Sequence, residues 1–184
     1  VSVKWYGAKG NGSTNDSLAV QKALNSTYDV WFPPGTYKVG THTVSNPKRI
    51  WGSNAILKQA SRKTTQAKLL TILSSGVTLE GLEFRGQIST QTSEFSHGIV
   101  IGNESGSGVT NVTISGVKIR DVRGDGIIIV SSADHCDNVV IQDVTIRNAY
   151  RNGIAIIAGN NINISNVDAD SIGLAGIDLE PDLL

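Results

Sequence analysis

The chain has 184 residues, which is enough for a single domain with one core. Its 16 basic residues balance 16 acidic ones, so the strongly positive surface of a nucleic-acid binder is not expected. A single cysteine excludes an internal disulfide, and no apolar run approaches the roughly 20 residues that span a bilayer. We therefore predict no nucleic-acid partner and no membrane insertion.

The N-terminal region is predicted to hold a short amphipathic helix followed by a strand. Polar residues at positions 13–16 supply candidates for the N-cap of this helix. Its apolar face is expected to contain Leu18, Val20, Ala23 and Leu24. The apolar segment 30–32 predicts a strand, which the Pro-Pro-Gly sequence at 33–35 ends in a turn.

The rest of the chain contains an internal repeat. Segments 111–126, 138–153 and 161–176 align without a gap, and a fainter copy begins at residue 76. Each segment is followed by a short apolar strand, and apolar residues alternate with polar ones inside it. A repeat of this length with period-2 alternation and no helical period predicts one coil of a parallel β-solenoid per copy.

Equivalent residues of successive coils are expected to stack in columns about 4.8 Å apart. The expected inward aliphatic columns are Val112/Val139/Ile162, Ile114/Ile141/Ile164, Val117/Val144/Val167, Ile99/Ile127/Ile154/Ile177 and Ile101/Ile129/Ile156/Leu179. A buried asparagine ladder is expected at one turn, formed by Asn111, Asn138 and Asn161. A bend with positive φ or a close backbone approach is expected at Gly98, Gly126, Gly153 and Gly176.

The N-terminal motifs point to a known superfamily. Residues 6–12 (YGAKGNG) and 31–37 (WFPPGTY) resemble the opening of the pectate-lyase-like, or pectin-lyase-fold, superfamily. The resemblance is closest to the branch of phage tailspikes, polysaccharide depolymerases and alginate epimerases. It implies an all-β, right-handed parallel β-helix with a short N-terminal capping helix, which binds sugar chains along an outward face. Because this scaffold carries hydrolases, lyases, epimerases and adhesins, it does not imply one reaction.

Two regions are predicted along the chain. Residues 1–40 form an N-terminal cap with a strand, the helix and the first coil, and residues 41–184 form the coils of the β-helix. No capping element follows the last repeat. Because an open solenoid end exposes backbone edges and apolar side chains, we expect the coils to continue in a longer protein or another chain to cover them.

The outward positions of the short strands contain the first candidate site. They are apolar in the early coils and become Asp178 and Glu180 in the last one, with Cα atoms about 6.6–6.8 Å apart. Glycoside hydrolysis needs two carboxyl groups about 5–5.5 Å apart for retention or about 6.5–9.5 Å for inversion. We predict Asp178 and Glu180 as the acid and the nucleophile or base, and a solvated pair at the edge of the stack is the alternative.

Three polar residues precede the bend glycines of successive coils and form a second candidate group. They are His97, Asp125 and Asn152. If the loop before His97 keeps the register, His97 and Asp125 meet and act as an oriented acid/base pair. We therefore predict Asp125 as catalytic, with His97 and Asn152 contacting the substrate. A turn histidine whose hydrogen bonds are all satisfied is the alternative.

A column of arginines forms the third candidate group. Arg85, Arg120 and Arg147 occupy equivalent positions, and the column ends in Asp170. Because stacked arginines repel unless they meet anions, Arg120 and Arg147 are predicted to bind an acidic polymer. The alternative is pairing with nearby carboxylates, for which the candidates are Glu83, Asp121 and Asp143.

No metal or cofactor is predicted. If the chain is a lyase, the resemblance implies Ca²⁺, for which Asp168 and Asp170 are the candidate ligands. Two acids alone do not supply the six to eight oxygens that Ca²⁺ takes.

An apolar stripe on the outward face predicts a partner. Its members are Val100, Ile128, Val130 and Ile157. A monomer rarely leaves such a patch exposed, and in tailspikes it would lie against neighbouring chains, so we predict a homotrimer. A loop that covers the stripe is the alternative.

The leading functional prediction is binding and cleavage of a cell-surface or extracellular polysaccharide by a glycoside hydrolase of the phage tailspike type. The alternatives are an acidic-polysaccharide lyase or uronate epimerase, and a spike or adhesin that binds sugar without turnover. A site beyond residue 184 is also considered. The resemblance implies an extracellular or virion-associated location on a phage tail.

Overall fold

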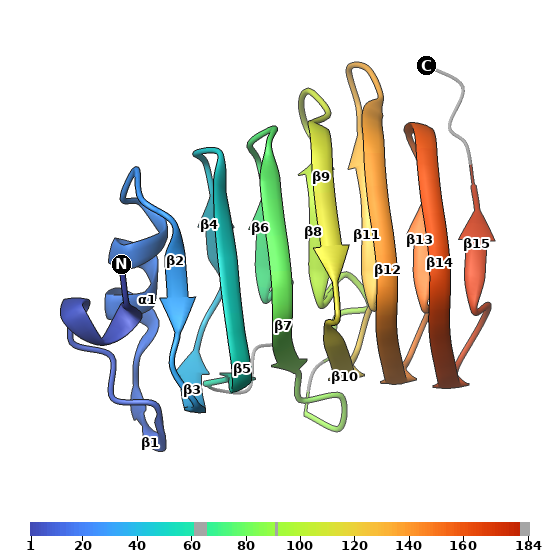
Figure 1. The fold of residues 1–184 in the computed structure, drawn as a ribbon. Coiled ribbons are helices and arrows are strands. Elements are labelled where there is room, and N and C mark those ends of the chain that lie inside the picture. The colour runs from blue at the N-terminus through green and yellow to red at the C-terminus, as the bar shows by residue number, and fades with distance from the viewer. Residues whose placement is uncertain (61–65, 91, 181–184) are drawn as a thin grey trace.

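The computed structural model describes residues 1–60, 66–90 and 92–180, which wind into a stack of parallel coils (Figure 1). The helix α1 (Ser17–Leu24) and the short 3-10 helix η1 (Val3–Tyr6) lie at the N-terminal end of the stack. The strand β15 (Ile177–Leu179) lies at the opposite end. The predicted all-β parallel β-helix with one short N-terminal helix is therefore confirmed.

Two parallel sheets make up the coils. The nine-stranded sheet contains β1 (Asn11–Asn15), β2 (Val30–Phe32), β3 (Gly35–Val39), β5 (Lys48–Gln59), β7 (Val77–Arg85), β9 (Thr110–Ser115), β10 (Lys118–Val122), β12 (Cys136–Ala149) and β14 (Gly159–Ile172). The six-stranded sheet contains β4 (His42–Val44), β6 (Leu70–Ile72), β8 (Ile99–Asn103), β11 (Ile127–Ser131), β13 (Ile154–Ile156) and β15. The candidate site lies over the second sheet.

The core lies between the two sheets and consists of the predicted aliphatic columns. Strand β12 aligns Ile141 with Ile114 on one side and with Ile164 on the other. In the six-stranded sheet, Ile127 aligns with both Ile99 and Ile154. The side chains of the middle coils are fully buried, whereas Ile164 in the last coil is only partly covered. The repeat therefore places like residues on like residues from coil to coil.

The asparagine ladder differs from the prediction. Asn111, Asn138 and Asn161 have left-handed backbones, with φ of 57°, 52° and 50°, and their side chains are exposed rather than buried. Asparagine tolerates this conformation, which turns the chain sharply and points the amide away from the core. Asn138 reaches Asn111 only over a long 3.5 Å contact, and Asn161 instead donates to Asp137 over 2.8 Å.

Two further columns of stacked turn residues also have left-handed backbones. Asp121 and Asp143 also have positive φ, and they accept hydrogen bonds from Asn148 over 2.7 Å and from Asn166 over 2.6 Å. These two acids thus bind amides of the next coil. The prediction that they pair with the arginine column is wrong for both.

The bend glycines are required by close backbone approach. A Cβ atom on Gly98 would lie 2.5 Å from the carbonyl oxygen of Gly126, and one on Gly126 would lie 2.6 Å from that of Gly153. Gly153 approaches Gly176 in the same way. Because a larger residue would separate the stacked backbones, this column keeps the coils in contact at the edge beside the site.

The N-terminal helix packs as predicted except at its first turn. Val20, Ala23 and Leu24 are buried, but Leu18 is 70 % exposed. Asp16 does not cap the helix with its side chain. Its carboxylate instead accepts hydrogen bonds from the backbone of Lys9 over 2.7 Å and of Gly10 over 3.0 Å, which closes the preceding turn.

Candidate functional site

A second apolar cluster covers the outer face of the six-stranded sheet, separate from the core. It consists of Val100, Ile128, Val130 and Ala155, with Ile157 packed against it. Of the predicted stripe, Val100, Ile128 and Val130 are buried and Ile157 is partly buried, so most of the stripe is covered by this chain itself. Side chains of the same chain stand around it, among them Gln66, Phe95 and Glu104. The burial removes the reason for expecting a homotrimer, and trimerisation stays a prediction.

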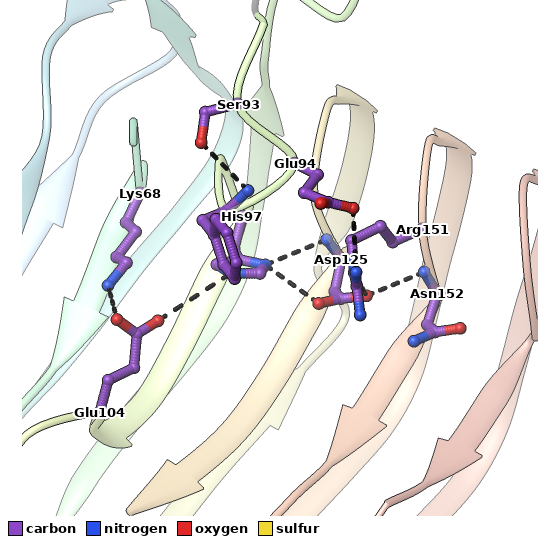
Figure 2. A network of polar contacts seen from close by, with 9 residues as sticks. Lys68, Ser93, Glu94, His97, Glu104, Asp125, Arg151 and Asn152 are labelled. Carbon is purple, nitrogen blue, oxygen red and sulfur yellow. Dashed lines mark hydrogen bonds and ion pairs between the residues drawn. The ribbon is translucent and has the colours of Figure 1, made fainter. Parts of the chain in front are cut away.

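His97 and Asp125 meet across neighbouring coils, just before β8 and β11 begin (Figure 2). His97 Nδ1 lies 3.1 Å from Asp125 Oδ2 and 3.1 Å from the backbone nitrogen of Asp125. The two side chains are only 2 % and 1 % exposed. Gly124 makes the approach possible, because a Cβ atom there would lie 2.7 Å from His97 Nδ1. The predicted encounter of the two residues is confirmed.

We assign the proton of the imidazole to Nδ1. Two contacts compete for Nδ1: the Asp125 backbone N–H points at it as a donor, which needs a lone pair there, whereas Asp125 Oδ2 can only accept, which needs a hydrogen there. We place the hydrogen on Nδ1 because a hydrogen bond to a charged carboxylate is stronger than one from a neutral amide. Nε2 then carries a lone pair. It is buried and has no hydrogen-bond partner among the described residues, with Glu104 Oε1 4.0 Å away, and His97 is one of the residues that line the cleft described below. The described contacts therefore do not match the alternative of a turn histidine whose hydrogen bonds are all satisfied.

Asp125 is held in its ionised form. Burial opposes the charge, but the hydrogen bonds from His97 and the Asn152 backbone, together with the charge of Arg151, outweigh burial and lower the pKa of Asp125. The Asn152 N–H donates to Asp125 Oδ1 over 2.9 Å, and Arg151 Nε lies 3.6 Å from the same oxygen. Both carboxylate oxygens are thus engaged by groups of the protein, and the predicted catalytic role of Asp125 stays a prediction.

Asn152 is buried next to Asp125. It is 0 % exposed, and its side-chain oxygen accepts a hydrogen bond from the backbone of Ala175 over 3.1 Å. Asn152 is not among the residues that line the cleft, its side-chain nitrogen has no partner among the described residues, and its contact with substrate stays a prediction. Its backbone N–H positions Asp125.

Asp178 and Glu180 lie where the alternation of β15 predicts. Asp178 is in register with Ala155, and the Glu180 N–H donates to the carbonyl of Ile156 over 3.0 Å. The Asp178 carboxyl raises the pKa of Glu180, through a hydrogen bond first and then through its negative charge. Glu180 therefore keeps its proton to higher pH than an ordinary glutamic acid.

His97, Asp125 and Glu180 line one cleft of about 420 Å³. It is lined by Gln66, Phe95, His97, Glu104, Asp125, Ile128, Val130, Arg151, Ile157 and Glu180. Its apolar lining comes from Ile128, Val130 and Ile157 of the second apolar cluster. Figure 2 shows His97, Asp125 and Arg151 in contact within one polar network. A concave apolar surface with a few convergent polar groups is the usual form of a small-ligand site.

Several polar residues at this cleft were not identified from the sequence. Arg151 binds Glu94 over 3.1 Å, and Lys68 forms an ion pair with Glu104. Glu94, Glu104 and Lys68 lie outside the aligned copies of the repeat, so no column indicates their place. Arg151 could have been noticed in the sequence, because it is the only charged residue at its position in the repeat: the aligned copies have Gly124 and Leu174 there.

The structure does not bring Arg120 and Arg147 to the cleft, because both lie on strands of the nine-stranded sheet. The predicted column is present, since Arg120 is in register with Arg147. Arg120 Nε lies 3.3 Å from Glu83, as the pairing alternative predicts. Arg147 forms its ion pair with Asp168. Substrate binding by these arginines stays a prediction.

The Ca²⁺ ligands that the lyase alternative requires do not fit the structure. Asp168 binds Arg147, and Asp170 lies 3.9 Å from the same guanidinium. Within residues 1–60, 66–90 and 92–180, no three acidic, histidine or cysteine side chains converge as metal ligands would. No chemical step is therefore assigned to a metal.

Family comparisons agree with this fold. Residues 1–50 match the rhamnogalacturonase A/epimerase, pectate-lyase-like family, and residues 48–181 match the right-handed β-helix family. The second match covers most of the chain, so the protein belongs to the right-handed β-helix family. This confirms the predicted superfamily and the hand of the coils. Over the described ranges, no helix combines the length and apolarity needed to cross a membrane.

A phage protein and two enzymes are among the similar proteins. The chain is 28 % identical over 198 residues to the pre-neck appendage protein of Bacillus phage phi29, covering 96 % of this chain and 21 % of that protein. The chain therefore spans only 21 % of the length of this curated relative.

Among solved structures, the iota-carrageenase of family GH82 from A. fortis has a TM-score of 0.77 at 19 % identity, covering 100 % of this chain and 45 % of that one. The A-module of the Azotobacter vinelandii mannuronan C-5 epimerase AlgE6 has a TM-score of 0.76 at 20 % identity, covering 96 % and 57 %. At these identities the two likenesses establish the fold alone.

Proposed function

We propose that the protein binds a polysaccharide in the cleft and hydrolyses a glycosidic bond there. The observation that carries the proposal is a buried histidine, in contact with an ionised aspartate, that lines the same cleft as Glu180 and whose Nε2 has no partner among the described residues. The names of the two structurally similar enzymes, which act on carrageenan and mannuronan, support a polysaccharide as the ligand.

The proposed acid and base roles follow from the different surroundings of Glu180, whose pKa is raised, and Asp125, whose pKa is lowered. Groups at one site whose pKa values are pushed apart divide into an acid and a base. Glu180, with its raised pKa, is the general acid. His97 is the general base, and Asp125, with its lowered pKa, holds the Nδ1 proton and stabilises the imidazolium that forms. Asp178 acts through Glu180 as a positioning residue rather than as the predicted nucleophile.

The chemical step is a single displacement. His97 Nε2 takes a proton from water while the water oxygen bonds to the anomeric carbon. The glycosidic carbon–oxygen bond breaks, and Glu180 gives its proton to the departing oxygen. These steps consume one water molecule for each glycosidic bond cleaved, and the single displacement inverts the anomeric configuration.

The similarity to a phage appendage protein supports a place on the virion. We infer that the chain is part of a longer appendage that meets glycans on a host surface. Antibody labelling of purified virions tests the location, and light scattering of the full-length protein tests the predicted trimer.

The test of hydrolysis uses the full-length protein and a panel of neutral and acidic polysaccharides. New reducing ends with an inverted anomer are expected, and Glu180→Gln and His97→Gln should each lower kcat by about 100-fold or more. Asp178→Asn should instead move the alkaline limb of the pH–rate profile to lower pH, because Glu180 loses the neighbour that raises its pKa. Asp168→Asn, on the other sheet, is the matched control and should leave turnover unchanged.

Other outcomes would replace the proposal with one of its alternatives. Products that absorb in the ultraviolet would identify a lyase, and inversion at C5 of a uronate would identify an epimerase. Binding without turnover would favour a spike or adhesin.

A further inference from the structure

A single row of basic residues crosses the nine-stranded sheet. Adjacent coils align Lys38 with Lys58 and Lys58 with Arg85. The row continues from Arg85 to Arg120 and from Arg120 to Arg147. The strands that contribute these residues, β3, β5, β7, β10 and β12, lie side by side in Figure 1. We call this row the basic ladder. It is longer than the arginine column of the repeat, because Lys38 and Lys58 precede the aligned copies.

The ladder faces away from the core. Lys38 lies between the buried residues Tyr37 and Val39, and the exposed Lys58 follows the buried Leu57. Because the side chains of a strand alternate between its two faces, the basic groups lie on the outer face of the sheet. At the spacing of about 4.8 Å between parallel strands, the five residues extend over about 19 Å along the axis of the coils.

The charge of the ladder is balanced unevenly by acids. At one end Arg147 is paired with Asp168. In the middle the single carboxylate of Glu83 serves two guanidiniums, with Arg85 2.6 Å and Arg120 3.3 Å away.

Lys38 and Lys58 belong to none of the ion pairs or side-chain hydrogen bonds formed between described residues. The chain as a whole is neutral, so its positive charge is concentrated at the lysine end of the ladder. Because like charges in register repel each other, this end is suited to a ligand that brings negative charge.

A hollow of about 430 Å³ lies beside the ladder at Lys58 and Arg85. The rest of its lining comes from the segment after β7 and from β10, and consists of Gly86, Gln87, Ile88, Ser89, Thr90 and Asp121. The Asp121 carboxylate already accepts a hydrogen bond from Asn148 over 2.7 Å. Two cations beside hydroxyl and amide groups can bind both the charged group and the hydroxyls of an acidic sugar.

We propose that the basic ladder is a second binding surface, which holds a linear acidic polysaccharide along the axis of the coils with one sugar unit in the hollow. A regular row of cations matches a polymer whose carboxylate, sulfate or phosphate groups repeat, whereas a small anion reaches only neighbouring members. Each exposed ion pair is weak, so the affinity depends on several contacts made at once. The inference goes beyond the proposed function, because the ladder lies on the other sheet and binds without turnover.

The test compares dextran sulfate with dextran, which have the same backbone and differ in charge, and adds polygalacturonate as the carboxylate polymer. The full-length protein should bind one or both of the acidic polymers, more weakly as the salt concentration rises, and Lys58 should not contribute to binding of dextran. Lys38→Glu combined with Lys58→Glu should weaken binding of the acidic polymer about tenfold or more. Lys4→Glu combined with Lys22→Glu changes the net charge equally on the N-terminal helices and should alter affinity less than about twofold.

Thermal melting of both double variants establishes that they are folded, and Glu180→Gln tests whether the cleft takes part. Equal losses in the two double variants, or a loss in Glu180→Gln alone, would overturn the ladder. Tighter binding of single-stranded DNA than of either acidic glycan would overturn a polysaccharide as its ligand. Lysine-dependent binding by a protein that cleaves no glycan would support the ladder and overturn the hydrolase. Cleavage without any lysine-dependent binding would do the reverse.

Discussion

At the scale of single residues, the site depends on one imidazole with two different surroundings. His97 Nδ1 lies against Asp125, whereas Nε2 has no hydrogen-bond partner among the described residues. Leaving a buried polar atom without a partner costs about 1–3 kcal/mol, so the fold accepts a loss of stability here. Such a loss is common where a group is kept ready for a ligand.

Asp125→Asn tests the charge of this pair. At neutral pH we expect the free energy of unfolding to fall by about 2 kcal/mol, because hydrogen bonds to a charged group are weakened. The pKa of Asp125 is lower in the folded state than in the unfolded chain, where it is about 3.9. The stabilisation is thus complete above the unfolded value and is lost as the pH falls through the folded one. Urea denaturation should therefore give converging curves in strong acid, and a constant difference would contradict this account.

Tyr37→Phe tests a buried hydroxyl in the core beside the cap. Tyr37 donates to the carbonyl of Pro33 over 2.8 Å, and its loss should cost about 1 kcal/mol at neutral pH. Burial, with the charge of Asp16 second, raises the pKa of Tyr37 to about 12. Between about pH 10 and pH 12 the unfolded chain ionises first, so wild-type stability declines as the pH rises. The variant should lack that part of the decline, which urea midpoints at neutral and alkaline pH would reveal.

At the scale of elements, residues 92–98, which precede β8, build one side of the site. They cross the turn at Gly124 and bring Glu94 to Arg151 in a later coil. Gly124 permits this crossing, because a Cβ atom there would lie 2.7 Å from both the Glu94 carbonyl oxygen and His97 Nδ1. The positions of this segment and of the His97 imidazole therefore both depend on the absence of a side chain at Gly124.

Gly124→Ala should lower stability by about 1–3 kcal/mol and reduce turnover, because the loop and the imidazole must move apart. Gly176→Ala is the matched substitution, since a Cβ atom there meets nothing within 4 Å, and its effect should stay within about 0.5 kcal/mol. Thermal melting and turnover of both variants provide the comparison. Equal effects would show that the close approach at Gly124 is not what positions the loop.

At the scale of the whole molecule, stability is the sum of contacts between adjacent coils. Ile114 lies between Leu79 and Ile141, and Ile141 lies between Ile114 and Ile164, whereas Ile164 has a neighbouring coil on only one side within the described residues. Each buried isoleucine therefore stabilises the stack in proportion to the neighbours that cover it.

Ile141→Ala should lower the free energy of unfolding by about 3 kcal/mol or more, because it leaves a cavity between two coils. Ile164→Ala, in the partly covered last coil, should cost about 1 kcal/mol. Urea unfolding of the two variants measures the difference. Equal losses would mean that the chain does not unfold as a stack of neighbour-dependent coils.

The fold was predictable because each coil repeats the same constraint. Alternating apolar residues, bend glycines and turn asparagines recur at fixed positions, and the register of Ile99, Ile127 and Ile154 follows from the alignment alone. The exposure of Asn111 was not predictable in this way, because a left-handed turn residue is identified by its backbone angle rather than by its place in a column.

The site was only partly predictable. Asp178, Glu180 and the meeting of His97 with Asp125 follow from the strand period and the bend position. The burial of Asn152, the position of Arg147 on the other sheet and the pairing of Arg151 with Glu94 do not.

The sequence by itself thus determined the β-helix, its registers and which acids share a face, since these depend on local period and on contacts between equivalent residues. The tertiary structure alone decided which atoms are left without partners, which carboxyls keep or lose their protons, and which side chains line the cleft. Those properties depend on burial and on distances between loops outside the repeat, which no periodic pattern encodes.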